Sequence, residues 1–283
     1  MEVIYVKCWP EAKKYLRSMI PAKPIENMLR QALESKSGLG NDDLNHLLRL
    51  LAKWRHALIT NTLIAKQGNV VQAGPFAGLH FIGQTSEGCS APRLLGCYEH
   101  ELHAHIEHLI EREFDTILNI GCDDGYYAVG LARWMPGVRV FAHDLNLEAQ
   151  TTCCAVAKLN GVADRVQMGG LFQGTDFSAF AGKKTWLVMD IEGGERELLD
   201  PFAYPALREM TVLVECHDCF APGMSTEIAR RFAETHTITR VDHALSAITL
   251  PDWLQGLGHL DHLLATWEWR IGPTPWLVME PKG

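Results

Sequence analysis

The chain has 283 residues, of which 47% are hydrophobic and 21% are charged, a composition typical of a globular protein with one or two domains. Disordered, fibrous and disulfide-stapled classes are therefore excluded. The 26 basic and 34 acidic residues give a net charge of −8, and no run of Lys or Arg is long enough to bind a row of phosphates. We expect neither nucleic acid nor membrane as a partner.

The sequence also lacks the features of an exported or membrane-bound chain. No apolar run reaches the length of a membrane helix, and residues 1–7 do not have the pattern of a secretory signal. The eight cysteines lie in apolar segments without the spacing of a secreted disulfide framework. Cys216 and Cys219 form a C-x-x-C pair, but no second pair lies at zinc-finger spacing. A cytoplasmic protein with reduced cysteines is predicted.

Residues 1–97 predict a helical subdomain followed by a loop-rich joint. Apolar residues recur at helical spacing from Ile25 to Leu33 and from Leu44 to Leu51, the second run after a capping-type sequence. Between residues 68 and 97 this periodicity fails and turn residues accumulate. The helices carry enough Leu and Ile for a homodimer face, although packing within their own chain explains these residues equally well.

Residues 98–283 show short apolar runs that alternate with helical stretches, which is typical of βαβ units around a parallel sheet. The predicted strands are 116–120, 138–142, 166–168, 186–189, 211–215, 238–241 and 276–280. Seven such strands predict a doubly wound, mostly parallel α/β sheet. Roughly 35 residues separate the last two strands, and an insert of that length often covers a substrate.

The turn after the first predicted strand has the features of a nucleotide-type cofactor site. Gly121 and Gly125 precede a helix, where small residues let a ligand approach and the helix N-terminus offers unpaired N–H groups. The spacing differs from G-x-G-x-x-G, which disfavours a nicotinamide dinucleotide. Asp144, at the end of the next strand, is placed to bind the hydroxyls of a ribose.

These residues carry a resemblance to a known family. The stretch Asn119-Ile-Gly-Cys-Asp-Asp-Gly125, with Asp144, resembles the cofactor site of class I S-adenosylmethionine-dependent methyltransferases. The stretches 188–195 (VMDIEGGE) and 214–217 (VECH) are similar to signatures of the FkbM-type methyltransferases. The resemblance covers residues 98–283, and it implies a Rossmann-like methyltransferase fold with S-adenosyl-L-methionine as the cofactor.

The resemblance implies cofactor contacts from the loops that follow the first four strands and from a segment just before the first strand. These residues are Tyr98, Glu101, Asn119, Gly121, Asp123, Gly125, Asp144, Leu145, Asn146, Gly170, Leu171, Phe172 and Asp190. Asn119 would contact the amino-acid part of the cofactor, and Asp144 the ribose. The chain departs from the family at Asn119, where an acidic residue is usual, and at Asp123, where a glycine is usual.

Titratable residues collect at the ends of the fourth and fifth predicted strands. Asp190 and Glu192 follow the fourth strand, and Glu215, His217 and Asp218 follow the fifth. In a doubly wound sheet, ligands bind outside the carboxyl ends of such strands. Because these groups are costly to bury together unless they are hydrogen-bonded, protonated or bound to a cation, they form a candidate catalytic cluster.

Methyl transfer requires alignment of the acceptor with the methyl group and, for a hydroxyl acceptor, removal of a proton. His217 is the predicted general base, oriented by Asp218 or Glu215. Asp190 and Glu192 could instead bind a divalent metal ion, which is possible but not favoured.

Three further groups have weaker signals. Glu195 is interpreted as a helix N-terminal residue favoured by the dipole. The four histidines within 100–108 do not share one helical face, and H-E-x-x-H is absent, so no metal site is predicted there. Trp267, Arg270 and Trp276 are predicted to line an acceptor pocket.

Three functional hypotheses follow. The first is O-methylation of a small-molecule hydroxyl. The second is N-methylation, or another reaction of the sulfonium cofactor, which would need no strong base for a neutral amine. The third is a non-catalytic module that senses the cofactor or binds a partner, in which Asn119 and Asp123 mark lost catalysis.

Overall fold

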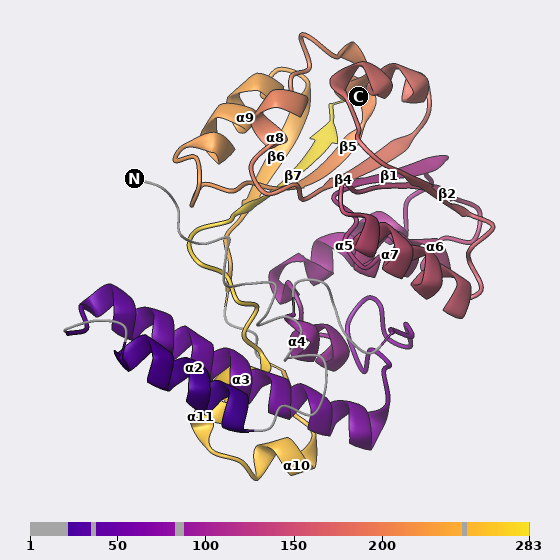
Figure 1. The fold of residues 1–283 in the computed structure, drawn as a ribbon. Helices are drawn as coiled ribbons and strands as arrows, with labels where there is room; N and C mark the ends of the chain where they lie inside the picture. Colours follow the sequence, from indigo (N-terminus) through magenta and orange to yellow (C-terminus); the bar gives the residue numbers. More distant parts are fainter. Residues whose placement is uncertain (1–21, 35–37, 83–87, 245–247, 283) are drawn as a thin grey trace.

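The computed structural model describes residues 22–34, 38–82, 88–244 and 248–282. Its centre is a seven-stranded sheet in the order β3-β2-β1-β4-β5-β7-β6 (Figure 1). The strands are β1 (Thr116–Ile120), β2 (Arg139–His143), β3 (Val166–Gly169), β4 (Thr185–Met189), β5 (Thr211–Glu215), β6 (His236–Val241) and β7 (Trp276–Pro281). Only β7 runs antiparallel to its neighbours. The predicted doubly wound α/β fold and all seven predicted strands are confirmed.

Helices cover both faces of this sheet, which explains why the central strands are continuous apolar runs. All residues of β1, β4 and β5 are buried, as expected of parallel strands between two helical layers. One face packs against α5 (His103–Ile110), α6 (Tyr126–Trp134) and α7 (Leu147–Leu159). The other packs against η3 (Gly174–Phe180), η4 (Pro205–Glu209) and α9 (Met224–Phe232), with the short α8 (Glu195–Leu198) beside α9.

The N-terminal helices pack against the insert between β6 and β7. The helical elements are α2 (Ala22–Glu34) and α3 (Asn41–Gln67) at the front, and α10 (Asp252–Gln255) and α11 (His259–Ala265) in the insert. Ile59 and Leu63 of α3 share a hydrophobic cluster with Leu254 and Leu264 of the insert. The predicted front helices are confirmed, and their core is completed by residues from the far end of the chain, across the predicted boundary at residue 97.

The predicted joint contains a helix that the sequence pattern did not indicate. α4 (Ser90–Leu95) is buried along its whole length and is followed by η2 (His100–Leu102). Prolines and glycines around it mimic a loop, so the helix depends on tertiary packing rather than on local propensity. Among the described helices, none is both long and apolar enough to cross a membrane.

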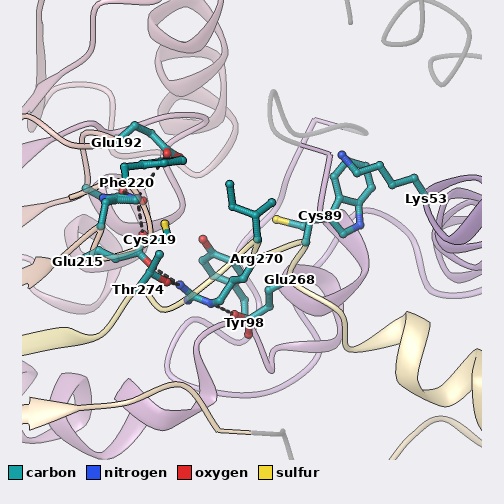
Figure 2. Close-up of a pocket in the computed structure, with 14 residues that line it drawn as sticks. Lys53, Cys89, Tyr98, Glu192, Glu215, Cys219, Phe220, Glu268, Arg270 and Thr274 are labelled. Carbon is teal, nitrogen blue, oxygen red and sulfur yellow. Dashed lines mark hydrogen bonds and ion pairs between the residues drawn. The ribbon is translucent and has the colours of Figure 1, made fainter. Parts of the chain in front are cut away.

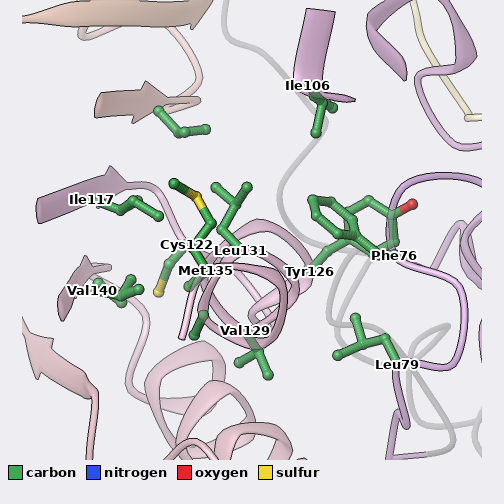
Figure 3. Close-up of a cluster of buried hydrophobic side chains, with 14 of the residues drawn as sticks. Phe76, Leu79, Ile106, Ile117, Cys122, Tyr126, Val129, Leu131, Met135 and Val140 are labelled. Carbon is green, nitrogen blue, oxygen red and sulfur yellow. The ribbon is translucent and has the colours of Figure 1, made fainter. Parts of the chain in front are cut away.

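The joint also docks onto α6, the helix that begins after the candidate cofactor loop. The ring of Phe76 meets that of Tyr126 edge-to-face at 5.0 Å (Figure 3). On the same helix, Gly130 leaves room for Phe76, because a Cβ there would lie 2.6 Å from the Phe76 ring. This contact fixes α6 on the side away from the sheet.

Gly130→Ala tests this docking. The added methyl group strains a fully buried ring, so we expect a net loss of about 1–3 kcal/mol in the free energy of unfolding, despite the better helix propensity of Ala. Urea denaturation measures the change. The control is Gly137→Ala, where a Cβ meets nothing within 4 Å and the change should stay within about 0.5 kcal/mol. Equal effects of the two substitutions would contradict close docking of Phe76.

Candidate functional site

Three cavities meet at the carboxyl ends of the parallel strands. The larger cavity has a volume of about 480 Å³ and lies beyond β1, β2, β3 and β4. The acid-lined cavity, of about 310 Å³, lies beyond β4 and β5 and is walled by residues 268–271 of the insert. An inner cavity of about 20 Å³ lies under the loop after β1. Asp190 lines all three, so ligands in the two main cavities would meet beside this residue.

Most of the predicted cofactor residues line the larger cavity. These are Gly121, Asp123, Asp144, Leu145, Asn146, Gly170, Leu171, Phe172 and Asp190. Tyr98 and Asn119 line the inner cavity instead, and Tyr98 also lines the acid-lined cavity. Glu101 and Gly125 line none of the three: the Glu101 side chain is turned to His243, at 3.2 Å, and Gly125 is the N-cap of α6. The prediction that these last two residues touch a cofactor is not supported by their positions.

Backbone geometry at the end of β1 leaves no room for a side chain. Gly121 has φ +77°, and a Cβ there would lie 1.6 Å from the carbonyl oxygen of Asp190. The carboxylate of Asp144 accepts hydrogen bonds from the backbone N–H groups of Asp123 (2.9 Å) and Asn146 (2.8 Å). These bonds hold the Asp144 carboxylate at the edge of the larger cavity, where a ligand hydroxyl could donate to it.

Asn119 carries an unsatisfied acceptor beside the inner cavity. Its residue is 1% exposed, and its Nδ2 donates to the carbonyl of Val188 at 3.3 Å. Its Oδ1 is buried with no hydrogen-bond partner among the described residues. Because buried polar atoms are nearly always paired, this oxygen marks a position for a ligand donor, such as an ammonium group.

Arg93 of α4 neutralises the acidic residues of the loop after β1. Its NH1 atom lies 2.7 Å from Asp124 Oδ2 and 3.0 Å from Asp123 Oδ2, and its guanidinium stacks over the Tyr98 ring. Burial raises the pKa of Asp124 to about 7, against the opposing effect of the Arg93 charge. The Arg93 contact explains how Asp123 is accommodated where the resembling family has glycine. No motif in the sequence marks Arg93.

His217 lines the acid-lined cavity among several carboxylates, of which Glu192 and Glu215 are labelled in Figure 2. Its Nδ1 lies 2.8 Å from Oε1 of Glu195. Its Nε2 lies 3.4 Å from carboxylate oxygens of Glu192 and Glu215 and 3.6 Å from that of Asp190. Four predicted catalytic residues are therefore brought together, and the carboxylate that bonds Nδ1 is one that the sequence did not place in the cluster.

Glu195 is the carboxylate that orients His217, and two predictions were therefore wrong. Glu195 begins α8, as predicted, but it is fully buried and bonds His217 instead of lying free at a helix end. The Asp218 carboxylate points elsewhere, since it accepts hydrogen bonds from the backbone N–H and hydroxyl of Ser225. Asp218 was predicted to orient His217 because it is the next residue in the sequence. In the folded chain, the segment after β4 instead brings Glu195 to 2.8 Å from Nδ1 of His217.

The carboxylates change the basicity of His217. Burial lowers the pKa of the imidazole, but the hydrogen bond to Glu195 and the charges of Glu215 and Glu192 outweigh it, so the pKa lies above its usual value. Burial raises the pKa of Glu192. His217 is therefore a stronger base than an exposed histidine, and its protonated form is stabilised by Glu195.

Arg270 forms a charged wall of the acid-lined cavity. It donates to Glu215 and lies 2.9 Å from Glu268 (Figure 2). It also lies 3.2 Å from Glu99. Next to it, Trp269 lines the cavity, and the Nζ of Lys53 from α3 lies 4.1 Å from the centre of its ring. The front helix thus contributes to the cavity that a second substrate would enter.

Two of the three predicted substrate residues lie elsewhere. Trp276 is 1% exposed and belongs to the sheet core, because it begins β7 and faces Tyr127 of α6. Trp267 packs on the cluster shared by α3 and the insert, with Arg49 over its ring at 5.4 Å. Arg270 alone of the three lines the acid-lined cavity.

Backbone strain in the described residues concentrates at these cavities. The non-glycine residues with positive φ in this part of the chain are Glu99 (51°), Asp123 (44°), Glu192 (59°) and Trp269 (66°). Three of them line a cavity, and Glu99 bonds Arg270. Such conformations cost about 1–3 kcal/mol each and collect at functional sites, so the strain points to the same place as the cavities.

The cluster is also able to hold a divalent cation. Asp190, Glu192 and His217 offer ligand atoms that all lie within 4.8 Å of one another. A carboxylate on the second nitrogen of a histidine, as Glu195 provides, is the usual support of a metal-bound imidazole. The arrangement is thus compatible with a proton or with a metal ion at Nε2.

Comparison with known proteins finds distant structural relatives. No protein-family model matches the chain, and no curated protein matches it. The O-methyltransferase TomG from Streptomyces achromogenes, solved in complex with SAM, is 16% identical over 68% of this chain and 83% of its own, with a TM-score of 0.45.

Two further solved structures are similar at the same level. A SAM-dependent O-methyltransferase from Thermotoga maritima is 16% identical over 63% of each chain, with a TM-score of 0.41. The ribosomal protein L11 methylase from Lactobacillus delbrueckii subsp. bulgaricus is 15% identical over 65% of this chain and 77% of its own, with a TM-score of 0.42. This likeness is distant and assigns no substrate or residue role to the present chain.

Arg93→Gln tests the charge balance of the loop after β1. Loss of the guanidinium leaves Asp124 buried without its cation, so the free energy of unfolding at pH 7 should fall by about 3–5 kcal/mol. Without Arg93 the pKa of Asp124 should rise above its native value of about 7. The variant then takes up the stabilising proton at higher pH than the native chain does, so the deficit should be largest above pH 7 and should shrink as the pH falls through about 7.

Urea denaturation at several pH values measures this deficit. The matched control is Arg112→Gln, which removes an exposed pair with Glu280 and should cost less than about 1 kcal/mol at every pH. A deficit for Arg93→Gln that is no larger than that of the control, or one that grows at low pH, would contradict the role given to Arg93.

Proposed function

We propose that the protein is an S-adenosylmethionine-dependent methyltransferase that acts on a hydroxyl of a small molecule, with His217 as the general base. One observation carries the proposal. The larger cavity and the acid-lined cavity meet at Asp190, and the basic Nε2 of a buried histidine lies 3.6 Å from that residue. A donor and an acceptor bound in the two cavities would therefore meet beside a base.

The residues present fit the cofactor. The Asp144 carboxylate is held by two backbone N–H groups and has lone pairs left for the ribose hydroxyls. Phe172 and Leu145 line the same cavity and would border the adenine. The buried, unpaired Oδ1 of Asn119 would accept a hydrogen bond from the ammonium group, so the loss of the family's acidic residue removes a charge but leaves an acceptor.

The protein's own residues take part in one chemical event, the removal of the acceptor's proton. When bound, S-adenosylmethionine would supply an electrophilic methyl group, and its methyl–sulfur bond would break to leave S-adenosylhomocysteine. The acceptor hydroxyl gives its proton to Nε2 of His217 as its oxygen forms the new bond to carbon. Glu195 fixes the tautomer with the proton on Nδ1 and stabilises the imidazolium that results, as a carboxylate does for the histidine of a catalytic triad.

The size of the acid-lined cavity supports a small acceptor. Its volume of about 310 Å³ is at the lower end of the range for small-molecule pockets. Arg270, Trp269 and Lys53 line it on the side of the insert and α3, and would contact the part of the acceptor that does not react. We also propose that the protein is of the FkbM type. This part of the proposal rests on the sequence resemblance, because no family model matches the chain.

A second candidate is transfer to an amine, which the carboxylates of this cavity favour. Asp190, Glu192, Glu215 and Glu268 line it and would attract a cationic acceptor. Such an amine must lose its ammonium proton before it reacts, and water can take that proton. The effect of His217→Ala separates the two reactions, because a neutral amine does not need His217 as a base.

Binding of the cofactor is tested first by calorimetric titration with S-adenosylmethionine and S-adenosylhomocysteine. We expect micromolar binding by the native chain, equivalent to about −8 kcal/mol. Asp144→Ala removes charge-assisted bonds of about 1.5–3 kcal/mol each, so its affinity should fall at least about tenfold. Asp164→Ala, at an exposed position outside the three cavities, is the control. Absence of binding at millimolar ligand would contradict the proposal.

The general base is tested by the pH profile of methyl transfer. Because the neutral imidazole is the active form and its pKa is raised, kcat should rise with pH over a range above that of an ordinary histidine. Glu195→Gln removes the charge bonded to Nδ1, so the rise should move to lower pH and the plateau should fall. Asp218→Asn, which removes a carboxylate that does not contact His217, should leave the rise in place.

Two outcomes of this experiment would contradict the base. One is a profile that His217→Ala leaves unchanged. The other is activity that disappears on chelation and returns with Mg²⁺ or Mn²⁺, which would make the cluster of Asp190, Glu192 and His217 a metal site.

A further inference from the structure

A second group of potential ligands lies at the wall of the acid-lined cavity, where Glu268 lines the cavity, and outside the cluster of Asp190, Glu192 and His217. Glu101 comes from η2, His243 follows β6, and Glu268 lies in the segment after α11. The Nδ1 of His243 is 3.2 Å from Oε1 of Glu101 and 3.9 Å from Oε2 of Glu268. Ligand atoms of all three residues lie within 4.8 Å of one another. Three segments that are distant in sequence therefore converge on one point.

Negative charge is in excess around this point. The side chains of Glu101 and Glu268 are 5% and 2% exposed, and Glu99 and Glu215 nearby are also buried. The Arg270 guanidinium bonds three of these carboxylates, those of Glu99, Glu215 and Glu268. Burial raises the pKa of Glu99 to about 8, so this carboxyl is neutral near pH 7, but Glu101, Glu215 and Glu268 still outnumber the Arg270 and His243 cations. Buried carboxylates of this kind are costly unless they are hydrogen-bonded, protonated or bound to a cation.

One carboxylate oxygen of the group also lacks a partner. Oε1 of Glu101 pairs with His243, but Oε2 is buried and has no hydrogen-bond partner among the described residues. It belongs to a side chain that is turned toward His243 and Glu268. This unpaired oxygen is independent of the charge count, and it offers an acceptor to an electropositive ligand between the three side chains.

We propose that Glu101, His243 and Glu268 bind a divalent metal ion of the zinc class, at a site separate from the catalytic cluster. Zinc takes histidine nitrogen and carboxylate oxygen at about 2.0–2.2 Å in tetrahedral geometry, which places ligand atoms roughly 3.4 Å apart. The 3.2 and 3.9 Å separations at His243 approach that spacing. Water would complete the coordination, since His243 is partly exposed.

The carboxylate of Glu268 is already held as a metal ligand needs to be. Its Oε1 accepts a hydrogen bond from the backbone N–H of Glu99 at 2.8 Å, and its Oε2 accepts one from Nε of Arg270 at 2.9 Å. Such outer hydrogen bonds orient a ligating group and leave a lone pair for the metal. The same contacts connect the ion to Arg270, which lines the acid-lined cavity.

The role of the ion is structural. It joins η2 and the segment after β6 to residues 268–270, so it fixes the wall that carries Trp269 and Arg270. It touches neither the larger cavity nor His217. The inference therefore does not depend on the proposed methyltransferase activity.

The test is calorimetric titration of chelator-stripped full-length protein with Zn²⁺, together with melting temperatures with and without Zn²⁺. We expect the native chain to bind Zn²⁺ and to melt at a higher temperature with it. His243→Ala and Glu101→Gln should each remove one equivalent, or weaken it more than tenfold, and abolish the thermal shift. His243 is partly exposed, so its variant should fold, which the metal-free melting temperature checks.

Two controls separate this site from its neighbours. Glu192→Gln changes the catalytic cluster and should leave the equivalent that depends on His243 in place. His100→Ala removes a nearby histidine outside the group and should change nothing. The proposal is overturned if Zn²⁺ binding and the thermal shift are absent from the native chain, if they persist in His243→Ala, or if Glu192→Gln alone removes them.

Discussion

The close approach of two strand ends is the constraint on which the whole site depends. The Gly121 backbone lies so near the carbonyl of Asp190 that a Cβ would be 1.6 Å away, and the N–H of Asp190 donates to Ile120 at 3.0 Å. The loops after β1 and β4 are thus fixed against each other. Because Asp190 lines the larger, the acid-lined and the inner cavity, the same contact determines where two bound ligands would meet.

Buried arginine–carboxylate pairs are the second constraint on the structure. Arg93 neutralises the acidic loop after β1, and Arg270 bonds carboxylates from three parts of the chain. Both arginines come from segments outside the sheet, in α4 and in the insert. α4 and the insert therefore supply the positive charges that stabilise the acidic residues at this edge of the sheet. These ion pairs hold both segments against the sheet edge.

The sequence predicted those features that depend on local pattern. Apolar runs located the strands, and the turn residues after them identified Gly121, Asp144, Asp190 and His217, because parallel strands bring their carboxyl ends to one edge. The contact of Glu195 with His217 and the helix that carries Arg93 depend on how the chain folds back in three dimensions. The prediction that Trp276 lines a pocket is wrong. The antiparallel pairing of β7 decides the direction of this side chain, and no local sequence pattern reveals that pairing.

A crystal structure with S-adenosylhomocysteine bound tests the central claim most directly. We expect the adenosine in the larger cavity, its ribose hydroxyls on Asp144, its amino-acid part near Asn119, and its sulfur beside Asp190 on the side of His217. Density at another location, or a sulfur directed away from the acid-lined cavity, would contradict the claim that the two cavities bring a methyl donor and an acceptor together at this residue.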